Sequence, residues 1–362
     1  MHRAPHRMHS NTWMTCLDNE LDNNADEPGA DGKPQPFASL GPDEVLTALE
    51  AVGVRCDGRL QALNSFENRV YLVGLEDGSS CVSKFYRPGR WRSEQILEEH
   101  RFARELVQAE IPVVAPESLP DGSTLAHVGG FRFAVYPRQG GRIPELDNVI
   151  HGPAMRDRIG QFIARIHNVG ARTPFADRPE INAQTYGHEP VAIIRDSGML
   201  PAELASSWLA IAGQCVAQVA ERFNQAGRLT TLRLHGDCHL GNLLWTDDGP
   251  HFVDLDDCRT GVAMQDLWMI ADAGTARAEQ FTSASSELEE LLAGYEKMRE
   301  LDRREVLLVE PLRTLRMIHY CAWLVQRWDD PAFQLAFPWF NTSRYWQDQV
   351  LYLREQSGNL QD

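Results

Sequence analysis

The sequence lacks the features that would mark a membrane or secreted protein. No apolar run approaches the roughly 20 residues that cross a bilayer, and no apolar core follows the basic N-terminus, as it does in secretory signals. The seven cysteines of this 362-residue chain include no CxxC pair, and their odd number does not predict a disulfide framework. We therefore expect no membrane partner and a reducing, cytoplasmic setting. Cys238, which lies in a polar loop, is the one cysteine to consider for reactivity, although packing is the simpler role.

An excess of positive charge is also missing. The chain has 35 Lys and Arg against 51 Asp and Glu, for a formal net charge of −16. A nucleic acid or an anionic membrane requires a basic face, so we expect neither as a partner. Residues 87–92 are the best candidate for a local basic patch, with a solvated surface as the equal alternative.

The length allows two domains with substantial cores, preceded by a tail. After Trp13, residues up to 37 hold few large apolar side chains, so we expect a disordered acidic tail over 1–37. His2, His6 and His9 fall within this tail, where mobile surface histidines are a simpler reading than a metal site.

Hydrophobic periodicity beyond the tail predicts a small antiparallel sheet with helices. The expected elements are a helix from 42, strands over 60–63, 69–73, 81–86 and 131–137, and a helix over 93–109. In the last third we expect long helices from 286, 303 and 323, with the tryptophans of that region packing between helices. Lys84 stands in the middle of an apolar strand, where its charge is costly without a partner or water. If the strands cover a nucleotide, Lys84 can reach its phosphates; the alternative is an edge-strand lysine that limits aggregation. In the following helix we expect Glu99 to turn inward to Lys84 and Glu98 to face solvent.

The stretch 234–257 carries the chemistry, with LHGDCHLGNLLW followed by a turn and FVDLDD. Apolar runs on both sides of an Asp-Asp-Gly-Pro turn predict a β-hairpin that brings Asp237, Asn242 and Asp254 together. Carboxylate and amide oxygens suit a hard divalent cation, and Asp237 can also accept a proton from a hydroxyl. The order Asp, four residues, Asn, turn, Asp is that of protein kinases and predicts a phosphotransferase.

Two alternatives to this interpretation remain open. His235, Asp237 and His239 alternate as zinc or iron ligands do in metallohydrolases, with His251 and His319 as further candidates, but no recognisable spacing joins them. A purely structural hairpin is disfavoured because four carboxylates crowd negative charge that a cation or basic partners must relieve: Asp237, Asp254, Asp256 and Asp257.

These motifs resemble the aminoglycoside-phosphotransferase and choline-kinase branch of the protein-kinase-like fold. Within that branch, the chain is similar to bacterial stress-response Ser/Thr protein kinases. The runs that carry this narrower resemblance are LNSFENRVY (63–71), KFYRPGRW (84–91) and DPAF (330–333), alongside LHGDCHLGN (234–242) and FVDLDD (252–257).

The resemblance implies an α+β, two-lobed fold. Residues 38–136 would form a small antiparallel-sheet lobe that binds nucleotide, and residues 137–362 a larger, mainly helical lobe for catalysis and substrate. It assigns Asp237 as the catalytic base, Asn242 and Asp254 as Mg²⁺ ligands, Lys84 as the phosphate-binding lysine paired with Glu99, and Ser65 as a contact of the nucleotide phosphates.

The implied reaction is Mg²⁺-dependent transfer of the ATP γ-phosphoryl group to protein Ser or Thr residues, by a monomer, in a bacterial stress response. A small-molecule kinase acting on an aminoglycoside, choline or an amino acid is the alternative, and a non-catalytic nucleotide-binding regulator is another. The HRD, DFG and glycine-rich patterns of protein kinases are absent, as is an activation loop of ordinary length. Asp266 is expected to hold the hairpin by accepting backbone hydrogen bonds.

Overall fold

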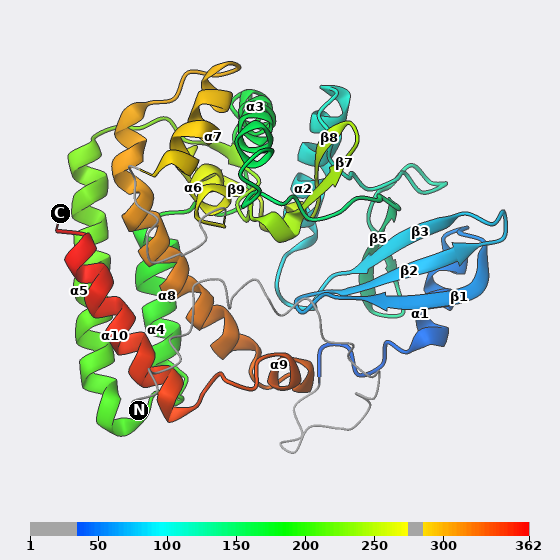
Figure 1. Cartoon of the computed structure of the whole chain (residues 1–362). Helices are drawn as coiled ribbons and strands as arrows, with labels where there is room; N and C mark the ends of the chain where they lie inside the picture. The colour runs from blue at the N-terminus through cyan, green and yellow to red at the C-terminus, as the bar shows by residue number, and fades with distance from the viewer. Residues whose placement is uncertain (1–34, 274–284, 362) are drawn as a thin grey trace, which may run out of the picture.

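The computed structural model describes residues 35–273 and 285–361 of the chain. A sheet with the helix Pro42–Ala51 forms one side of the molecule, a mainly helical part forms the other, and the helix Ser93–Gln108 lies beside the helical part (Figure 1). The predicted α+β architecture is therefore confirmed. Of the predicted tail, residues 1–34, which include the three N-terminal histidines, lie outside the described residues, whereas Phe37 is buried and stacks on Phe131 at 6.2 Å.

The small lobe contains one antiparallel sheet of five strands in the order β1-β2-β3-β5-β4. The strands are β1 (Cys56–Leu63), β2 (Arg69–Leu75), β3 (Ser80–Phe85), β4 (Ala126–Val128) and β5 (Phe131–Pro137). Lys84 in β3 is opposite Val70 on one side and Ala134 on the other, so its strand is central. The alternative of an edge-strand lysine is therefore wrong.

Alternation along β3 and β5 separates two apolar faces of the sheet. Phe85 and Phe133 pack into the cluster that includes α1 (Pro42–Ala51). Tyr86 and Ala134 belong to the other cluster, with Ile96 of α2 (Ser93–Gln108). Lys84 shares the face of Tyr86 by the period of two, which directs it toward α2 and the large lobe.

The large lobe is built around helices that bury one continuous apolar core. The helices are α3 (Gly152–Gly170), α4 (Glu189–Asp196), α5 (Ala202–Ala226), α6 (Met264–Ala273), α7 (Ser286–Glu296), α8 (Val309–Arg327), α9 (Pro331–Ala336) and α10 (Ser343–Asn359). Shorter turns precede them or join them: a π turn at Gln184–His188 and 3₁₀ turns at Leu240–Asn242, Leu255–Asp257 and Arg303–Leu308. In Figure 1, α5, α8 and α10 run alongside one another at the side away from the sheet.

Two small strand pairs lie between the lobes and carry the predicted catalytic stretch. β6 (Leu232–Leu234) pairs with β9 (Arg259–Gly261), and β7 (Leu243–Thr246) pairs with β8 (Gly249–Phe252). The hairpin is thus confirmed, with a tighter turn than expected because Gly249 and Pro250 already belong to β8.

One helix of the C-terminal third was placed wrongly. We expected a new helix near Trp323, but this residue lies inside α8, and the next long helix, α10, begins at Ser343. Helical structure is interrupted between them at Asp330, where the backbone is extended, as is usual for the residue before a proline. The tryptophans of this region pack as expected: Trp346 meets Trp208 edge to face at 6.2 Å.

Across residues 35–273 and 285–361, no helix combines the length and the apolar character of a membrane span.

Truncation of a leucine should cost different amounts of stability at a buried and at an exposed position of this fold. Leu49 of α1 is fully buried against the sheet, whereas Leu351 of α10 is 57% exposed. Leu49→Ala should lower the free energy of unfolding by about 2–5 kcal/mol, and Leu351→Ala should change it by less than about 0.5 kcal/mol. Urea unfolding followed by circular dichroism measures both, and equal effects would contradict the packing of α1 on the sheet.

Candidate active site

Asp266 at the start of α6 holds the loop that precedes β7. Its buried carboxylate accepts the backbone N–H of His235 at 2.8 Å and of Gly236 at 2.9 Å. The ring of His167 lies 3.1 Å from the same carboxylate, through Nε2. Hydrogen bonds to an ionised acceptor are stronger than neutral ones, so this carboxylate fixes the loop, as the sequence predicted.

Gly236 is required where protein kinases carry the arginine of HRD. Its φ is +85°, which favours glycine, and a Cβ atom there would lie 2.1 Å from the carbonyl oxygen of Asp257. The absence of an HRD arginine therefore has a steric cause: the backbone after β8 passes directly beside this position.

Asp237 follows in the loop and lies between two basic side chains. Its Oδ1 is 2.6 Å from Nη1 of Arg316 in α8, and its Oδ2 is 3.5 Å from Nε2 of His239. Burial by itself opposes ionisation, but Arg316 and His239 outweigh it and hold the pKa of Asp237 well below its usual range. Sequence reasoning missed Arg316 because no motif or spacing connects α8 with the loop.

Asn242 ties the two strands of the hairpin to the loop. Its side-chain Nδ2 donates to the backbone carbonyl oxygen of Asp237 at 3.0 Å, and its backbone carbonyl oxygen accepts the N–H of Val253 at 3.0 Å. Because the amide nitrogen is engaged, the side-chain oxygen is the atom left to bind a cation.

Asp254 is the second residue after β8 and has a left-handed backbone conformation, with φ +57° and ψ +68°. Few residues other than glycine adopt this region, and such residues concentrate at functional sites. Its side chain is 53% exposed, and Oδ1 accepts from Lys84 Nζ at 2.8 Å. A lysine from the central strand of the small lobe and an aspartate from the large lobe therefore meet directly.

Three carboxylates surround the ammonium group of Lys84, at 2.8 Å for Asp254, 3.3 Å for Asp256 and 3.6 Å for Glu99. Burial alone favours the neutral amine, but these charges raise the pKa of Lys84 well above its usual value. The predicted inward turn of Glu99 is confirmed, and Arg178 contacts the same glutamate at 3.1 Å. Burial raises the pKa of Glu99, against the opposing charge of Lys84.

Glu98 is not exposed to solvent, contrary to expectation. It is 5% exposed and accepts three consecutive backbone N–H groups of the large lobe: Ala176 at 2.7 Å, and Asp177 and Arg178 at 2.9 Å each. Helical periodicity describes only the faces of α2, whereas the segment after α3 that covers Glu98 comes from another part of the chain.

Ser65 lies in the turn between β1 and β2, which stands where protein kinases have a glycine-rich loop. The hydroxyl donates to the carbonyl oxygen of Asn68 at 3.2 Å and is half-buried. Its role toward phosphates stays a prediction.

The donor set fits magnesium better than a transition metal. Among the described residues, no three His, Cys, Asp or Glu side chains gather as a metal site would require. Mg²⁺ is commonly held by one or two protein oxygen ligands plus phosphates and water. Asn242 and Asp254 can provide the protein oxygens.

The metallohydrolase alternative fails: Nε2 of His235 contacts the carbonyl oxygen of Val253 at 2.9 Å, and His319 stacks on Tyr186 at 3.9 Å. Cys238 is buried, and burial raises the pKa of its thiol, in line with a packing role.

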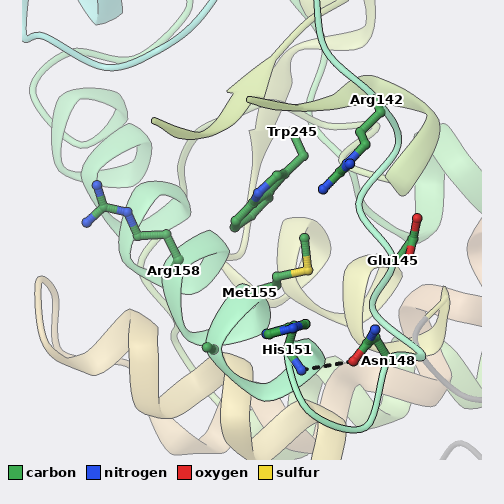
Figure 2. Close-up of a pocket in the computed structure, with 8 residues that line it drawn as sticks. Arg142, Glu145, Asn148, His151, Met155, Arg158 and Trp245 are labelled. Carbon is green, nitrogen blue, oxygen red and sulfur yellow. Dashed lines mark hydrogen bonds between the residues drawn. The ribbon is translucent and has the colours of Figure 1, made fainter. Parts of the chain in front are cut away.

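A cavity of about 510 Å³ lies beside this site, between the start of α3 and the hairpin (Figure 2). It is lined by Arg142, Glu145, Asn148, His151, Ala154, Met155, Arg158 and Trp245. Arg142 and Trp245 exchange two backbone hydrogen bonds, at 3.1 and 2.6 Å, which attach the segment after β5 to the hairpin. The lining includes neither Lys84 nor Asp237, so this cavity is separate from the centre described above.

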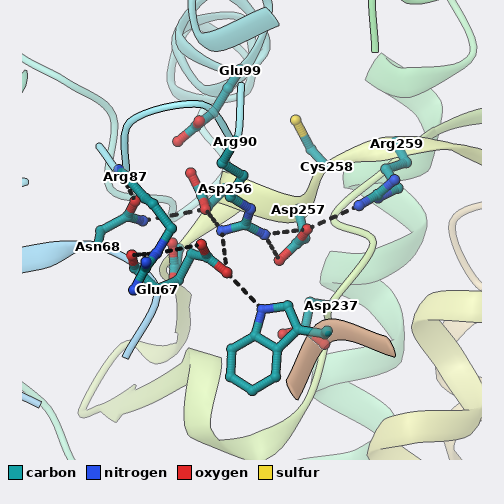
Figure 3. A network of polar contacts seen from close by, with 12 residues as sticks. Glu67, Asn68, Arg87, Arg90, Glu99, Asp237, Asp256, Asp257, Cys258 and Arg259 are labelled. Carbon is teal, nitrogen blue, oxygen red and sulfur yellow. Dashed lines mark hydrogen bonds and ion pairs between the residues drawn. The ribbon is translucent and has the colours of Figure 1, made fainter. Parts of the chain in front are cut away.

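Within residues 87–92, Arg87 and Arg90 form neither a basic patch nor a solvated surface, contrary to both expectations, whereas the side chain of Arg92 is exposed and pairs with Asp177 at 2.8 Å. Arg90 is buried between the lobes, where it pairs with Asp256 and, at 2.7 Å, with both oxygens of Asp257 (Figure 3). Arg87 donates to Asp330 at 2.6 Å. Arg90 and Lys84 thus neutralise three of the four aspartates whose crowding the sequence revealed, Asp254, Asp256 and Asp257, and Arg316 neutralises Asp237.

The ion pair between Arg316 and Asp237 predicts a change in titration. In Arg316→Ala the main charge that keeps Asp237 ionised is lost, so the pKa of the carboxyl should rise and protonation should occur at higher pH. Carboxyl-carbon NMR of aspartate-labelled protein measures this directly. Arg313→Ala, one turn earlier on α8, is the matched control, because Arg313 pairs with Asp272 and Glu310. An unchanged Asp237 titration in Arg316→Ala would contradict the assigned ion pair.

Comparisons with known proteins agree with this geometry. The model of the phosphotransferase enzyme family (APH) matches residues 59–305. Stress response kinase A of Escherichia coli K12 is 43% identical over 326 residues, covering 90% of this chain and 95% of the relative. A Salmonella typhimurium relative, named serine/threonine protein kinase RdoA, is 42% identical with the same coverage.

Solved structures show the same fold at low sequence identity. Amicoumacin kinase hAmiN, solved with AMP-PNP, Ca²⁺ and its ligand, has a TM-score of 0.68 at 20% identity, covering 88% of this chain and 93% of that one. A microcompartment-associated aminopropanol kinase has a TM-score of 0.64 at 18% identity, covering 88% and 96%. The chain thus belongs to the phosphotransferase enzyme family and, within it, is a homologue of the stress response kinase A proteins.

Proposed function

We propose that this protein transfers the γ-phosphoryl group of ATP to Ser or Thr hydroxyls of proteins, with Mg²⁺, in the cytoplasm, as part of a stress response. The observation that carries the proposal is the contact between Lys84 and Asp254 at 2.8 Å, across the two lobes, beside the loop of Asp237. A relative named as a Ser/Thr protein kinase supports the choice of acceptor, and free cysteines at the described positions suit a reducing compartment.

Lys84, Asn242 and Asp254 act on the nucleotide in this proposal. Bound Mg²⁺ would neutralise phosphate charge, held by the oxygens of Asn242 and Asp254. Lys84 exchanges its contact with Asp254 for the phosphates when nucleotide enters, while Glu99 keeps the ammonium group oriented. Ser65 contributes a hydroxyl to the phosphates from the β1–β2 turn.

Asp237 orients the acceptor hydroxyl and takes its proton as the oxygen attacks the γ-phosphorus. Arg316 keeps this carboxylate ionised and occupies Oδ1. The oxygen that meets the acceptor is Oδ2, which lies 3.5 Å from Nε2 of His239.

Removal of the base should separate chemistry from binding. We expect Asp237→Ala to reduce phosphoryl transfer by at least roughly 10²-fold, while ATP affinity stays within about a factor of ten. Radiolabel transfer and equilibrium binding of ATP measure the two quantities. Asp248→Ala, in the exposed turn of the same hairpin, is the control. Near-normal turnover in Asp237→Ala would remove the residue from this role.

Asp254→Ala should instead weaken nucleotide binding only when magnesium is present. Titration of ATP with and without Mg²⁺, by calorimetry, separates the metal-dependent part of the affinity. The wild type should bind ATP more tightly with Mg²⁺, and the variant should lose that difference. A variant that keeps the full magnesium dependence would refute Asp254 as a ligand.

The acceptor class is decided by a labelling experiment. The protein is incubated with Mg²⁺ and γ-labelled ATP, alone, with casein, with histone, and with an aminoglycoside or choline. Autophosphorylation or protein labelling that disappears in Asp237→Ala supports the proposal. Labelling of the small molecule alone favours the other kinase class, and no labelling at all indicates a non-catalytic regulator.

A further inference from the structure

Three of the sequence runs that carry the resemblance to stress-response kinases meet in one buried network between the lobes, and Figure 3 shows the part around Glu67, Arg87 and Arg90. They are the NSFENR turn between β1 and β2, the RPGR segment after β3, and the DPAF start of α9. We call this the Glu67 network, defined as Glu67, Asn68, Arg87 and Arg90 of the small lobe with Asp256, Trp323, Arg327 and Asp330 of the large lobe. The proposed chemistry assigns no role to most of these residues.

Glu67 is the centre of the network. One oxygen, Oε2, accepts from Nε1 of Trp323 and from Nε of Arg327, both at 2.6 Å and both from α8. The other oxygen lies 3.1 Å from Nε of Arg87. The side chain of Glu67 is 11% exposed, so water competes little with these charge-assisted hydrogen bonds.

The residues on either side of Glu67 also contact the large lobe. The ring of Phe66 lies 5.0 Å from that of Phe337, and Nδ2 of Asn68 donates to Asp256 at 3.2 Å. Three consecutive residues thus attach the β1–β2 turn to the opposite lobe. The turn has no glycine between 64 and 69, so side-chain anchors take the place of the flexible backbone of a glycine-rich loop.

From this arrangement we infer that Glu67 is a positioning residue that holds the β1–β2 turn closed over the nucleotide phosphates through its bonds to α8. The inference rests on the proposed function, because it takes residues 64–68 as the phosphate loop. Nucleotide can enter or leave only when the contact of Glu67 with Trp323 and Arg327 opens. Ser65, two residues earlier, is brought to the phosphates when that contact closes.

Loss of one charge-assisted bond should therefore speed nucleotide release. Glu67→Gln keeps the shape of the side chain but removes its charge, and Trp323→Phe keeps an aromatic ring but removes the indole N–H donor together with the pyrrole ring. In each variant, Mg²⁺-bound methylanthraniloyl-ADP should dissociate about tenfold faster. The KM for the protein acceptor should stay within about twofold of the wild type.

Two control variants separate this role from a general contribution to folding. Glu290→Gln removes the charge of another carboxylate, which lies 2.7 Å from Nε of the buried Arg156, outside the Glu67 network. Trp328→Phe replaces an indole that packs on Phe340 beyond the end of α8. Both should leave the dissociation rate of the fluorescent nucleotide unchanged, whatever their effect on thermal stability.

Stopped-flow dissociation of methylanthraniloyl-ADP from the full-length protein decides the question. Faster release in Glu67→Gln and Trp323→Phe, with unchanged release in the controls, supports the inference. Unchanged release in the first pair, even with a lower Tm, would assign the network to fold stability alone and overturn the inference. If the wild type binds no nucleotide with Mg²⁺, the proposed function itself fails, and the inference fails with it.

Discussion

The charge of Lys84 constrains the whole arrangement. The residue lies in the central strand of the small sheet, and a buried ammonium group is tolerated only where opposite charge replaces water. Glu99 supplies one carboxylate from α2 of the same lobe, while Asp254 and Asp256 supply two from beyond the catalytic hairpin. Neutralising this lysine thus requires the lobes to approach, and their approach creates the site.

The aspartates that satisfy Lys84 would repel one another without further cations. Arg90 pairs with Asp256 and Asp257, and Arg259 contacts Asp257 at 3.3 Å. The interface is therefore an alternating set of charges with few ways to rearrange. Removing one member would leave its buried partners with less opposite charge than burial requires, which destabilises the interface. This explains how an acidic chain concentrates arginines at the place where its carboxylates gather.

The loop that carries Asp237 depends on a second buried carboxylate. Asp266 accepts the backbone N–H groups of His235 and Gly236 and so holds this loop in place. Asp237 then projects toward Arg316, and Asn242 keeps its oxygen available. Pre-organisation of this kind reduces the reorganisation that phosphoryl transfer would otherwise require, and it places the polar groups without a glycine-rich loop or an activation segment.

Local sequence determined much of this protein: the hairpin, the strand that carries Lys84, the inward turn of Glu99 and the bonds of Asp266. The first three follow from short-range periodicity or from a motif whose residues lie close in the chain, and the role of Asp266 follows from the resemblance to the kinase-like family. Only the tertiary structure decided that Glu98 is buried, that Arg87 and Arg90 are paired, and that Arg316 contacts Asp237. Those side chains meet partners from distant segments, and their burial depends on how the lobes pack, which no local pattern encodes.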